Sequence, residues 1–468
     1  MGTLTAGAAR ACITPPMGTR MAGYAERTEG CRAAHDDLHA KALVLDNGKA
    51  KLALLTLDLI GMDGAQVAQV RKGVEVATDI PGDSVMVCCS HTHAGPVMPS
   101  SDPRRDPLGE DAREVPARVT VLVDTLAGLV RQADGRRQPV RLRYLQGSLP
   151  GLSMNRRRAA QGGTPVDPEV RTLVLTGEDE APVAVVVNFT CHPTVMGGKN
   201  LTVTAEYPGA MARLVEAACP GCAALFVQGT CGNLNPNWFK LERASFGTIE
   251  RMGRALGGEV LRGVYTGIAT QPPEDDVTLK AVSSVAPLPL WPQPDLEGAR
   301  EILKAQESLL ARARAGGFPA NPLPFWHSMA VDENLSAGTA ESYVKWAQKL
   351  VRLAEGGIRV AAPAAEAQAL RIGPGAIASL PGEAFMELGM GIKEAFPDRP
   401  VLVAGYTNGS LGYIPTREAF PEQGYEVTVA QRARTIPIAE GGGEMLVERA
   451  VEGLREIFER GKEEGKSP

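Results

Sequence analysis

Short runs of consecutive apolar residues recur through the first two-thirds of the chain and return near its C-terminal end. Runs of this length, rich in β-branched residues, predict strands that are buried on both faces. Helix-like stretches follow several of them, which predicts a mixed α/β fold (α+β) of layered, mixed β-sheets flanked by helices. The expected strands are 41–45, 52–57, 84–89, 170–175, 183–189, 223–227, 367–380 and 401–403.

Helices are expected where apolar residues recur at helical spacing. Residues 207–218 follow Glu206, an acidic residue that favours a helix start, and residues 248–264 show a similar pattern. The last helix is expected at about 444–464, where four apolar residues form one stripe. The sequence shows no internal repeat.

The segment from about 285 to 358 differs in character from its surroundings. It opens with several prolines and becomes helical at Asp295, a residue type that favours a helix start. A Pro-rich break at 317–324 precedes a second helical stretch at 341–354. We therefore expect a helical insertion or cap within a single catalytic domain that spans residues 1–468.

The composition argues against two classes of protein. The chain has 468 residues, of which 44% are hydrophobic, and its net charge is −5 without a long basic run. A nucleic-acid partner is therefore not expected. No stretch approaches the ~18 consecutive apolar residues of a membrane span, so no span is expected either. A homo-oligomer is compatible with this composition.

The N-terminus lacks the basic start and the apolar run of about 7–15 residues that a secretory signal requires. This predicts a cytoplasmic protein. The cysteines fit a cytoplasmic protein, because Cys88, Cys89 and Cys191 stand in apolar runs and are expected to be buried free thiols. Cys219 and Cys222 form an isolated CxxC. Since a structural zinc site normally needs four close ligands, we expect this pair to be structural.

Residue types that bind metals follow three of the predicted strands. His91 and His93 come directly after 84–89, His192 follows 183–189, and Glu383 follows 367–380. If the first strand continued, His91 and His93 would point to the same side. Each also has a structural alternative: His91 and His93 as a hydrogen-bonded pair, His192 as a core histidine, and Glu383 as a carboxylate at a helix start. Taken together, two imidazoles and a carboxylate are typical of a catalytic zinc site.

Two polar segments offer groups that contact a substrate. The turn at 228–237, which contains Asn235, has glycines and an Asn-Pro step, so its backbone amides can face a ligand. Arg156 belongs to a short basic cluster, which is usually solvated surface but can instead bind a carbonyl or carboxylate.

Tyr406, Tyr413 and Tyr425 follow the strand at 401–403. Tyrosines near a metal can bind it or donate to an oxyanion, although most tyrosines are packing residues. The chain has no HExxH helix, no GxSxG elbow and no phosphate-binding Gly-Lys-Ser/Thr loop. The corresponding classes of hydrolase and nucleotide-binding protein are therefore excluded.

Several short motifs stand in one order along the chain, from about residue 8 to about residue 430. They are Ile13-Thr-Pro-Pro with Gly18, Ala22-Gly23-Tyr24, Ser90-His-Thr-His-Ala-Gly-Pro, Asn155-Arg156, Cys191-His192-Pro-Thr, Gly232-Asn-Leu-Asn-Pro-Asn, Pro381-Gly-Glu383, and the pair Tyr413 and Tyr425. This ordered set resembles the catalytic, N-terminal domain of the neutral/alkaline (non-lysosomal) ceramidase family.

The resemblance implies a hydrolase with one zinc ion (Zn²⁺) per chain. The implied metal ligands are His91, His192, Glu383 and Tyr413. The implied catalytic residues are His93 as general base, with Tyr425 and Arg156 beside the reacting carbonyl. The tyrosine assignment uses spacing, because the family's two functional tyrosines stand twelve residues apart, as Tyr413 and Tyr425 do.

Departures from the family's pattern bear on the substrate more than on the reaction. The family has a serine where this chain has Asn235, which still offers hydrogen bonds to a substrate. The family's C-terminal β-sandwich and a secretion signal are also not expected here. A small amide of the N-acyl type therefore fits better than ceramide. The alternatives are an esterase or lactonase on the same site, a true ceramidase, and a non-catalytic metal-binding relative.

Overall fold

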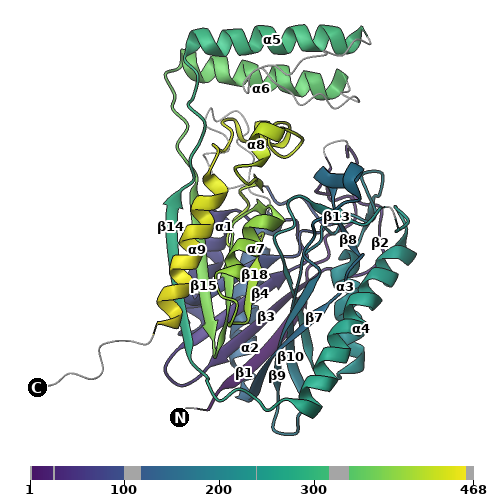
Figure 1. Ribbon diagram of the computed structural model, residues 1–468, viewed down its shortest axis with the longest axis vertical. Helices are drawn as coiled ribbons and strands as arrows, with labels where there is room; N and C mark the ends of the chain where they lie inside the picture. Colours follow the sequence, from purple (N-terminus) through teal and green to yellow (C-terminus); the bar gives the residue numbers. More distant parts are fainter. Residues whose placement is uncertain (1–2, 25–26, 100–116, 239, 316–336, 460–468) are drawn as a thin grey trace, which may run out of the picture.

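The computed structural model describes residues 3–24, 27–99, 117–238, 240–315 and 337–459. In this part of the chain, the strands form three main sheets with helices on their outer sides, below a layer of loops and a helical hairpin (Figure 1). The mixed α+β class expected from the sequence is confirmed. None of the described helices is long and apolar enough to cross a membrane.

The first sheet comes from the N-terminal part of the chain. Its strands, in order of pairing, are β5 (Val85–Cys89), β4 (Lys51–Leu57), β3 (His39–Asp46), β1 (Thr5–Cys12) and β6 (Gln138–Pro139). Strand β3 runs antiparallel to β1 and β4, whereas β4 and β5 are parallel. Helix α1 (Gly64–Ala77) connects the parallel pair, and α2 (Ala117–Asp134) packs beside it. A capping box between Asp63 and Gln66 sets the start of α1.

The second sheet has the same plan. Its strands, in order of pairing, are β12 (Ala223–Gln228), β10 (Pro182–Phe189), β9 (Glu169–Thr176) and β7 (Arg141–Ser148). Strands β7, β9 and β10 form an antiparallel meander, and β10 and β12 are parallel. Helix α3 (Glu206–Ala218) connects the parallel pair, and α4 (Phe246–Thr270) packs against α3.

The third sheet repeats the plan once more. Its strands, in order of pairing, are β14 (Leu279–Pro287), β15 (Ala364–Ile372), β16 (Gly375–Ser379) and β18 (Val401–Ala404). Strands β14, β15 and β16 are antiparallel, and β16 and β18 are parallel. Helix α7 (Met386–Glu394) connects the parallel pair and contacts α9 (Gly442–Phe458). The expected strand region 367–380 therefore contains two strands rather than one.

The three sheets face one another across a shared core. Leu54 of β4, Val186 of β10 and Ile377 of β16 belong to one cluster of buried side chains. On its other face, each sheet packs against its own pair of helices: α1 with α2, α3 with α4, and α7 with α9. Each central strand is thus buried on both faces, which explains why its apolar residues are consecutive instead of alternating.

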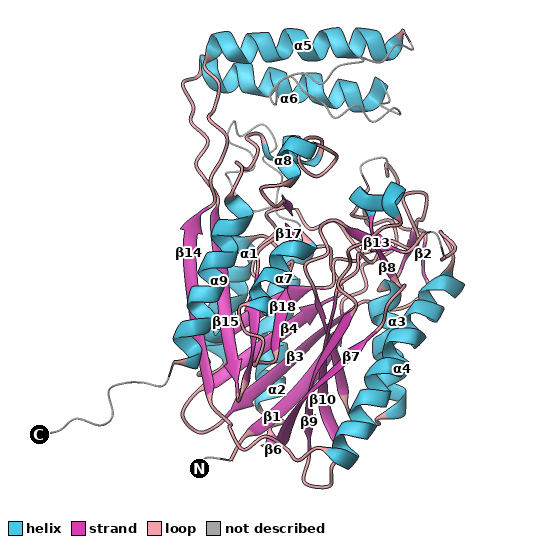
Figure 2. Cartoon of the chain, in the orientation of Figure 1, coloured by secondary structure: helices cyan, strands magenta, loops and turns pink. Residues whose placement is uncertain are grey.

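Two more helices, α5 (Leu296–Arg314) and α6 (Ala337–Glu355), form a hairpin in the connection from β14 to β15. The hairpin lies above α8 (Ala419–Glu422), at the loop end of the sheets (Figure 2). Asp295 starts α5 as expected, because its side chain accepts a hydrogen bond from the Gly298 amide at 2.8 Å. The expected break at 317–324 lies outside the described residues. The expected start of the insertion near 285 falls inside β14.

The loop layer holds short elements that matter for the site. They are the strands β2 (Ala33–Ala34), β8 (Ser153–Asn155), β11 (Thr202–Val203), β13 (Leu234–Pro236), β17 (Glu383–Ala384) and β19 (Tyr413–Ile414), and the 3₁₀ helices η3 (Arg156–Gln161) and η4 (Ala430–Arg434). A further 3₁₀ turn, η1 (Gly82–Ser84), precedes β5 at the opposite end.

Candidate metal centre

The three sheets each contribute one side chain to a common point in the loop layer. His91, His192 and Glu383 lie just beyond the carboxyl ends of β5, β10 and β16. Glu383 Oε2 is 3.4 Å from His91 Nε2 and 3.4 Å from His192 Nε2. The structure therefore brings together three of the predicted ligands from segments that are far apart in the sequence.

Backbone carbonyls of neighbouring strands orient both imidazoles. His91 Nδ1 is 2.7 Å from the carbonyl oxygen of Ile60, which follows β4. His192 Nδ1 is 2.8 Å from the carbonyl oxygen of Leu234 in β13, which follows β12. Since a carbonyl only accepts, each Nδ1 carries the hydrogen and each Nε2 presents a lone pair to the centre.

This donor set fits a metal ion. The Glu383 oxygen lies 3.4 Å from the lone pair of each of two imidazoles, an arrangement of acceptors that needs a shared cation or proton. The ligand nitrogens of His91, His93 and His192 all lie within 4.8 Å of one another. Imidazole and carboxylate groups oriented by backbone carbonyls are the usual protein ligands of catalytic zinc.

The pKa shifts in the centre agree with a neutral His192 imidazole beside an ionised Glu383 carboxylate. Burial lowers the pKa of His192 to about 4. Burial alone would raise the pKa of the Glu383 carboxyl, but the imidazoles of His91 and His192 outweigh it and hold that pKa well below its usual value. A neutral imidazole and an ionised carboxylate are the protonation states that bind a metal.

His93 reaches the centre by a turn rather than along a strand. The conditional expectation of a continuing strand is wrong, because β5 ends at Cys89 and His91 has a φ of 64°. Even so, His93 Nε2 lies 3.0 Å from His91 Nε2. Burial and the adjoining imidazoles hold the pKa of His93 well below its usual value. His93 is thus a neutral group beside the metal ligands, as a general base requires.

The Ala-Gly-Tyr motif near the N-terminus packs against His93. Gly23 has a φ of 97°, and a Cβ placed on it would lie 2.6 Å from the His93 ring. The Tyr24 ring meets the His93 ring edge-on at 5.2 Å between centroids, and Arg27 Nη1 donates to the His93 carbonyl at 2.5 Å. This motif therefore holds the second histidine in place.

Two of the three tyrosines lie side by side at the edge of the centre. Tyr413 pairs through its backbone with Glu383, and its buried ring is 5.7 Å from the ring of Tyr425. The Tyr425 side chain is 53% exposed. The twelve-residue spacing therefore corresponds to a real contact. The binding of metal by Tyr413 and the contact of Tyr425 with substrate stay predictions.

Tyr406 is the tyrosine that packs most directly on a ligand, although the sequence assigned it no role. Its ring stacks on His91 at 4.0 Å between centroids, and its hydroxyl is hydrogen-bonded to the Cys231 thiol at 3.1 Å. Both stacked residues have positive φ, which costs about 1–3 kcal/mol for a residue that is not glycine. Two strained backbone conformations therefore occur together at the site.

Arg156 lies between the centre and a surface cavity, and three contacts fix it. Its Nε donates to Glu426 Oε1 at 2.6 Å, Nη1 to Asn235 Oδ1 at 3.2 Å, and Nη2 to the Gly232 carbonyl at 2.6 Å. Its guanidinium carbon is 5.3 Å from the centre of the Tyr413 ring. Asn235, expected to bind substrate, therefore contacts Arg156 directly.

The sequence did not reveal Glu426 as part of the site. Both of its carboxylate oxygens bind arginines, because Oε2 also accepts from Arg157 Nη1 at 2.9 Å. Its position next to Tyr425 was the only available signal. The adjacent arginines at 156 and 157 gave no indication of which acid would meet them.

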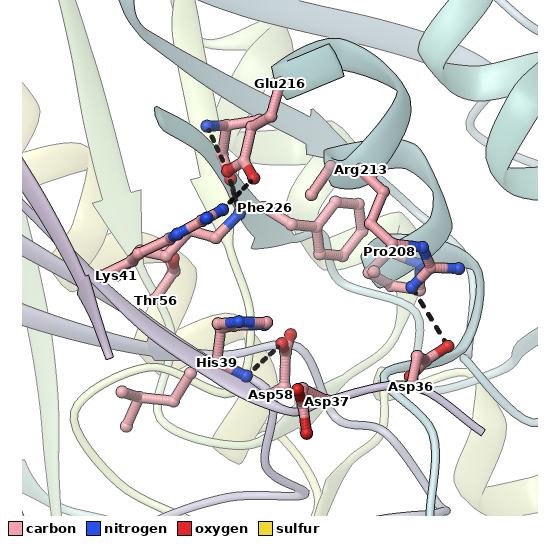
Figure 3. A pocket seen from close by; sticks show the side chains of 15 residues that line it. Asp36, Asp37, His39, Lys41, Thr56, Asp58, Pro208, Arg213, Glu216 and Phe226 are labelled. Carbon is pink, nitrogen blue, oxygen red and sulfur yellow. Dashed lines mark hydrogen bonds and ion pairs between the residues drawn. The ribbon is translucent and has the colours of Figure 1, made fainter. Parts of the chain in front are cut away.

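A second cavity, of about 290 Å³, lies between the first sheet, α3 and β12 (Figure 3). Its charged groups pair with one another: Lys41 Nζ is 2.5 Å from Glu216 Oε1, and Arg213 Nη1 is 3.1 Å from Asp36 Oδ2. None of the predicted site residues lines it. This cavity is therefore separate from the metal centre.

The predicted structural cysteines also have their expected setting. Cys88, Cys89, Cys191, Cys219 and Cys222 are all buried and free. Within the described residues, no cluster of metal-binding side chains includes the CxxC pair.

Comparison with known proteins points to one family. The chain is 24% identical to a neutral ceramidase of Mycobacterium tuberculosis over 87% of its own length and 70% of that protein's. It is also 24% identical to a neutral ceramidase of Pseudomonas aeruginosa, over 87% of its own length and 66% of that protein's. Two solved structures share its fold. A ceramidase complexed with C2 matches with a TM-score of 0.71 and 18% identity, over 97% of this chain and 76% of that one. Neutral ceramidase from Pseudomonas aeruginosa matches with a TM-score of 0.70 and 19% identity, over 100% of this chain and 77% of that one. These relatives define the protein as a hydrolase.

The family assignment is more specific. The profile of the family described as neutral/alkaline non-lysosomal ceramidase, N-terminal, matches residues 4–241. This chain therefore belongs to the neutral/alkaline non-lysosomal ceramidase family, whose members hydrolyse the amide bond of ceramide. The resemblance expected from the ordered motifs is confirmed.

Proposed function

We propose that this protein is a zinc-dependent hydrolase that cleaves the amide bond of an N-acyl or similar small substrate. Water adds to the carbonyl carbon, the C–N bond breaks, and the products are a carboxylate and an amine. The observation that carries the proposal is the convergence of His91 Nε2, His192 Nε2 and Glu383 Oε2 from three different sheets. Membership of the ceramidase family supports the choice of an amide bond.

His91, His192 and Glu383 would hold the zinc ion, with Tyr413 as the fourth ligand. A zinc ion bound there supplies Lewis-acid activation of the water and of the substrate carbonyl. Imidazole and carboxylate ligands with an open position are typical of catalytic zinc, which is why we choose this metal.

The other residues of the site handle protons and charge. His93 accepts the proton of the attacking water and delivers it to the leaving nitrogen, which departs as a neutral or protonated amine. Arg156 and Tyr425 donate hydrogen bonds to the oxyanion that forms from the carbonyl. Asn235 keeps Arg156 in position, since its Oδ1 accepts from the guanidinium.

The test combines metal content with activity. Purified protein should contain about one zinc per chain and should release carboxylate from members of a panel of N-acyl amino acids, ceramides and small amides. His91→Ala and His192→Ala should lose both the metal and the activity, because each removes a ligand. His39→Ala is the matched control, since His39 lies in the second cavity away from the centre. Full activity after complete removal of metal would contradict the proposal.

A further inference from the structure

A surface cavity of about 670 Å³ opens beside Arg156, whose guanidinium carbon lies 5.3 Å from the centre of the Tyr413 ring. It is lined by the three arginines of η3 and by residues 422–426. Arg156 and Tyr425, the residues proposed to face the reacting carbonyl, form part of its wall. A substrate whose carbonyl meets these two side chains therefore extends into this cavity on at least one side.

The lining of the cavity is unsuited to a long alkyl chain. Apart from the Tyr425 ring and Gly424, its lining residues carry charged or amide groups. Covering ionised groups with hydrocarbon removes their hydration without returning hydrogen bonds, which is unfavourable. Cavities that hold apolar ligands are instead lined mainly by apolar and aromatic side chains. The part of the substrate that lies here is therefore short and polar.

The charges in the cavity are unequal, and the excess is positive. Three guanidinium groups line it against the two carboxylates of Glu422 and Glu426. Glu426 pairs with two of these guanidinium groups, since its oxygens accept hydrogen bonds from Arg156 and Arg157. Glu422 is shared between Arg157 and Arg158.

Arg158 is the most exposed of the three arginines and has capacity for a ligand away from the reacting carbonyl. Its side chain is 42% exposed, and within the described residues its hydrogen-bond partner is Glu422, reached through Nη2 at 2.5 Å. Glu387 also acts on it electrostatically, but Glu387 does not line the cavity and accepts both of its contacts from Asn233. A guanidinium has five N–H donors in a planar fork, so Arg158 can bind a second carboxylate while keeping Glu422.

Building on the proposed function, we propose that the substrate is a short amide with a carboxylate close to the scissile bond, as in an N-acyl amino acid, and that Arg158 binds this carboxylate. The carboxylate supplies the negative charge that the cavity lacks. Arg158 is then a specificity residue that contacts the substrate away from the reacting atoms.

The experiment compares two substrates that differ only in the carboxylate. N-hexanoylglycine carries it, N-hexanoylethylamine lacks it, and hexanoate is released from both. With wild-type protein, kcat/KM should be higher for N-hexanoylglycine. Arg158→Ala should lower that value by about tenfold or more, mainly through KM, as expected for loss of one charge-assisted hydrogen bond. The same variant should leave the hydrolysis of N-hexanoylethylamine nearly unchanged.

Two further variants and a binding measurement complete the design. Arg158→Lys should keep part of the preference, because the charge stays but the fork is lost. Arg449→Ala is the matched control, since Arg449 is another exposed arginine with one glutamate partner. Calorimetric titration of wild type and Arg158→Ala with N-hexanoylglycine, after metal removal, reports binding without turnover.

The outcomes separate this inference from the proposed function. Equal kcat/KM for the two substrates in wild type, or an equal loss for both in Arg158→Ala, would overturn the inference and leave the amide hydrolase standing. Binding of N-hexanoylglycine that depends on Arg158, without hydrolysis of either amide, would support the inference and refute the hydrolase. If the protein showed no hydrolysis of either amide and no Arg158-dependent binding, both the inference and the proposed function would be overturned.

Discussion

Glu426 holds two consecutive arginines at once, although only one of them faces the reacting centre. Its side chain is 2% exposed, and burial alone would raise the pKa of its carboxyl. The guanidinium groups of Arg156 and Arg157 outweigh this and lower that pKa, so the carboxylate stays ionised. The position of Arg156 therefore depends on a residue that does not itself contact the metal ligands.

This dependence gives a prediction for Glu426→Gln. The variant removes the charge that holds Arg156, so kcat should fall by about tenfold or more while metal content is unchanged. The free energy of unfolding should also fall, by about 3–5 kcal/mol, because Arg156 loses its carboxylate partner and Arg157 keeps only Glu422. Steady-state kinetics and urea denaturation measure the two effects. Glu422→Gln is the control, because Glu422 contacts Arg157 and Arg158 but not Arg156. Equal effects of both variants would contradict the prediction.

The residues of the site differ in how far the sequence could reveal them. His91, His192 and Glu383 were predictable because each follows a predicted strand, and sites in α/β proteins are commonly built at strand ends. Glu426 and Tyr406 were not, because their roles depend on which distant side chain lies opposite. No local pattern records that Glu426 meets Arg156 or that Tyr406 stacks on His91.

At the level of elements, the hairpin of α5 and α6 is tied to the segment that carries Tyr425 and Glu426. Trp346 of α6 donates its indole N–H to the Thr435 carbonyl at 2.8 Å. The Arg432 guanidinium lies 5.2 Å from the Trp346 ring and 4.7 Å from that of Tyr343. The insertion is therefore positioned to stabilise one wall of the site.

Trp346→Ala should loosen this wall. It removes a buried hydrogen bond and a cation–π contact, so amide hydrogen exchange in residues 425–435 should become about tenfold faster or more. The value of kcat/KM should fall, while zinc content stays the same because no ligand lies on the hairpin. Trp346→Phe, which keeps a ring beside Arg432, should restore part of the loss. Unchanged exchange in Trp346→Ala would show that the hairpin does not support this segment.

A surface change on the same hairpin is the control for that experiment. Arg300→Ala removes an exposed ion pair with Glu355, which contributes about 0–1 kcal/mol. It should leave both the exchange rates and the kinetics near the wild-type values.

The elements themselves were largely predictable, but their pairing was not. Burial on both faces made the central strands continuous apolar runs, and these were found close to their observed limits, as for β10 and β12. All three sheets have the same strand arrangement, yet the sequence shows no repeat. The arrangement is defined by which strands pair, and strand pairing is not written in the sequence of any one segment. The turn after β5 was also missed, since the positive φ of His91 is set by tertiary contacts.

For the whole molecule, the position of the site follows from the packing of the sheets around one core. Each sheet ends in a parallel pair, and the carboxyl ends of a parallel pair lie at the same edge. One strand of each pair carries a predicted ligand, and the partner strand leads to the group that orients or contacts it: Ile60, Leu234 and Tyr413. The candidate metal centre therefore forms only when all three sheets are assembled.

The stability of this assembly should depend on pH through Glu206, at the start of α3. Glu206 is 1% exposed, and burial, reinforced by Asp36, raises the pKa of its carboxyl from 4.5 to about 7. Between these pH values the folded protein keeps a proton that the unfolded chain has released. This part of the stability is therefore present below pH 4.5 and is lost as the pH rises toward 7. The loss between pH 5 and 8 amounts to ~2 kcal/mol.

Glu206→Gln cannot ionise, so it should lack this part of the pH dependence. Urea denaturation at pH 5 and pH 8 would measure it: relative to wild type, the variant should gain ~2 kcal/mol on going from pH 5 to pH 8. Taking the difference between the two proteins cancels the other titrating groups, including those of the metal centre. Glu242→Gln, at a side chain that is 70% exposed, should show no such gain. A parallel pH dependence in wild type and Glu206→Gln would mean that the buried carboxyl titrates in the folded protein as it does in the unfolded chain.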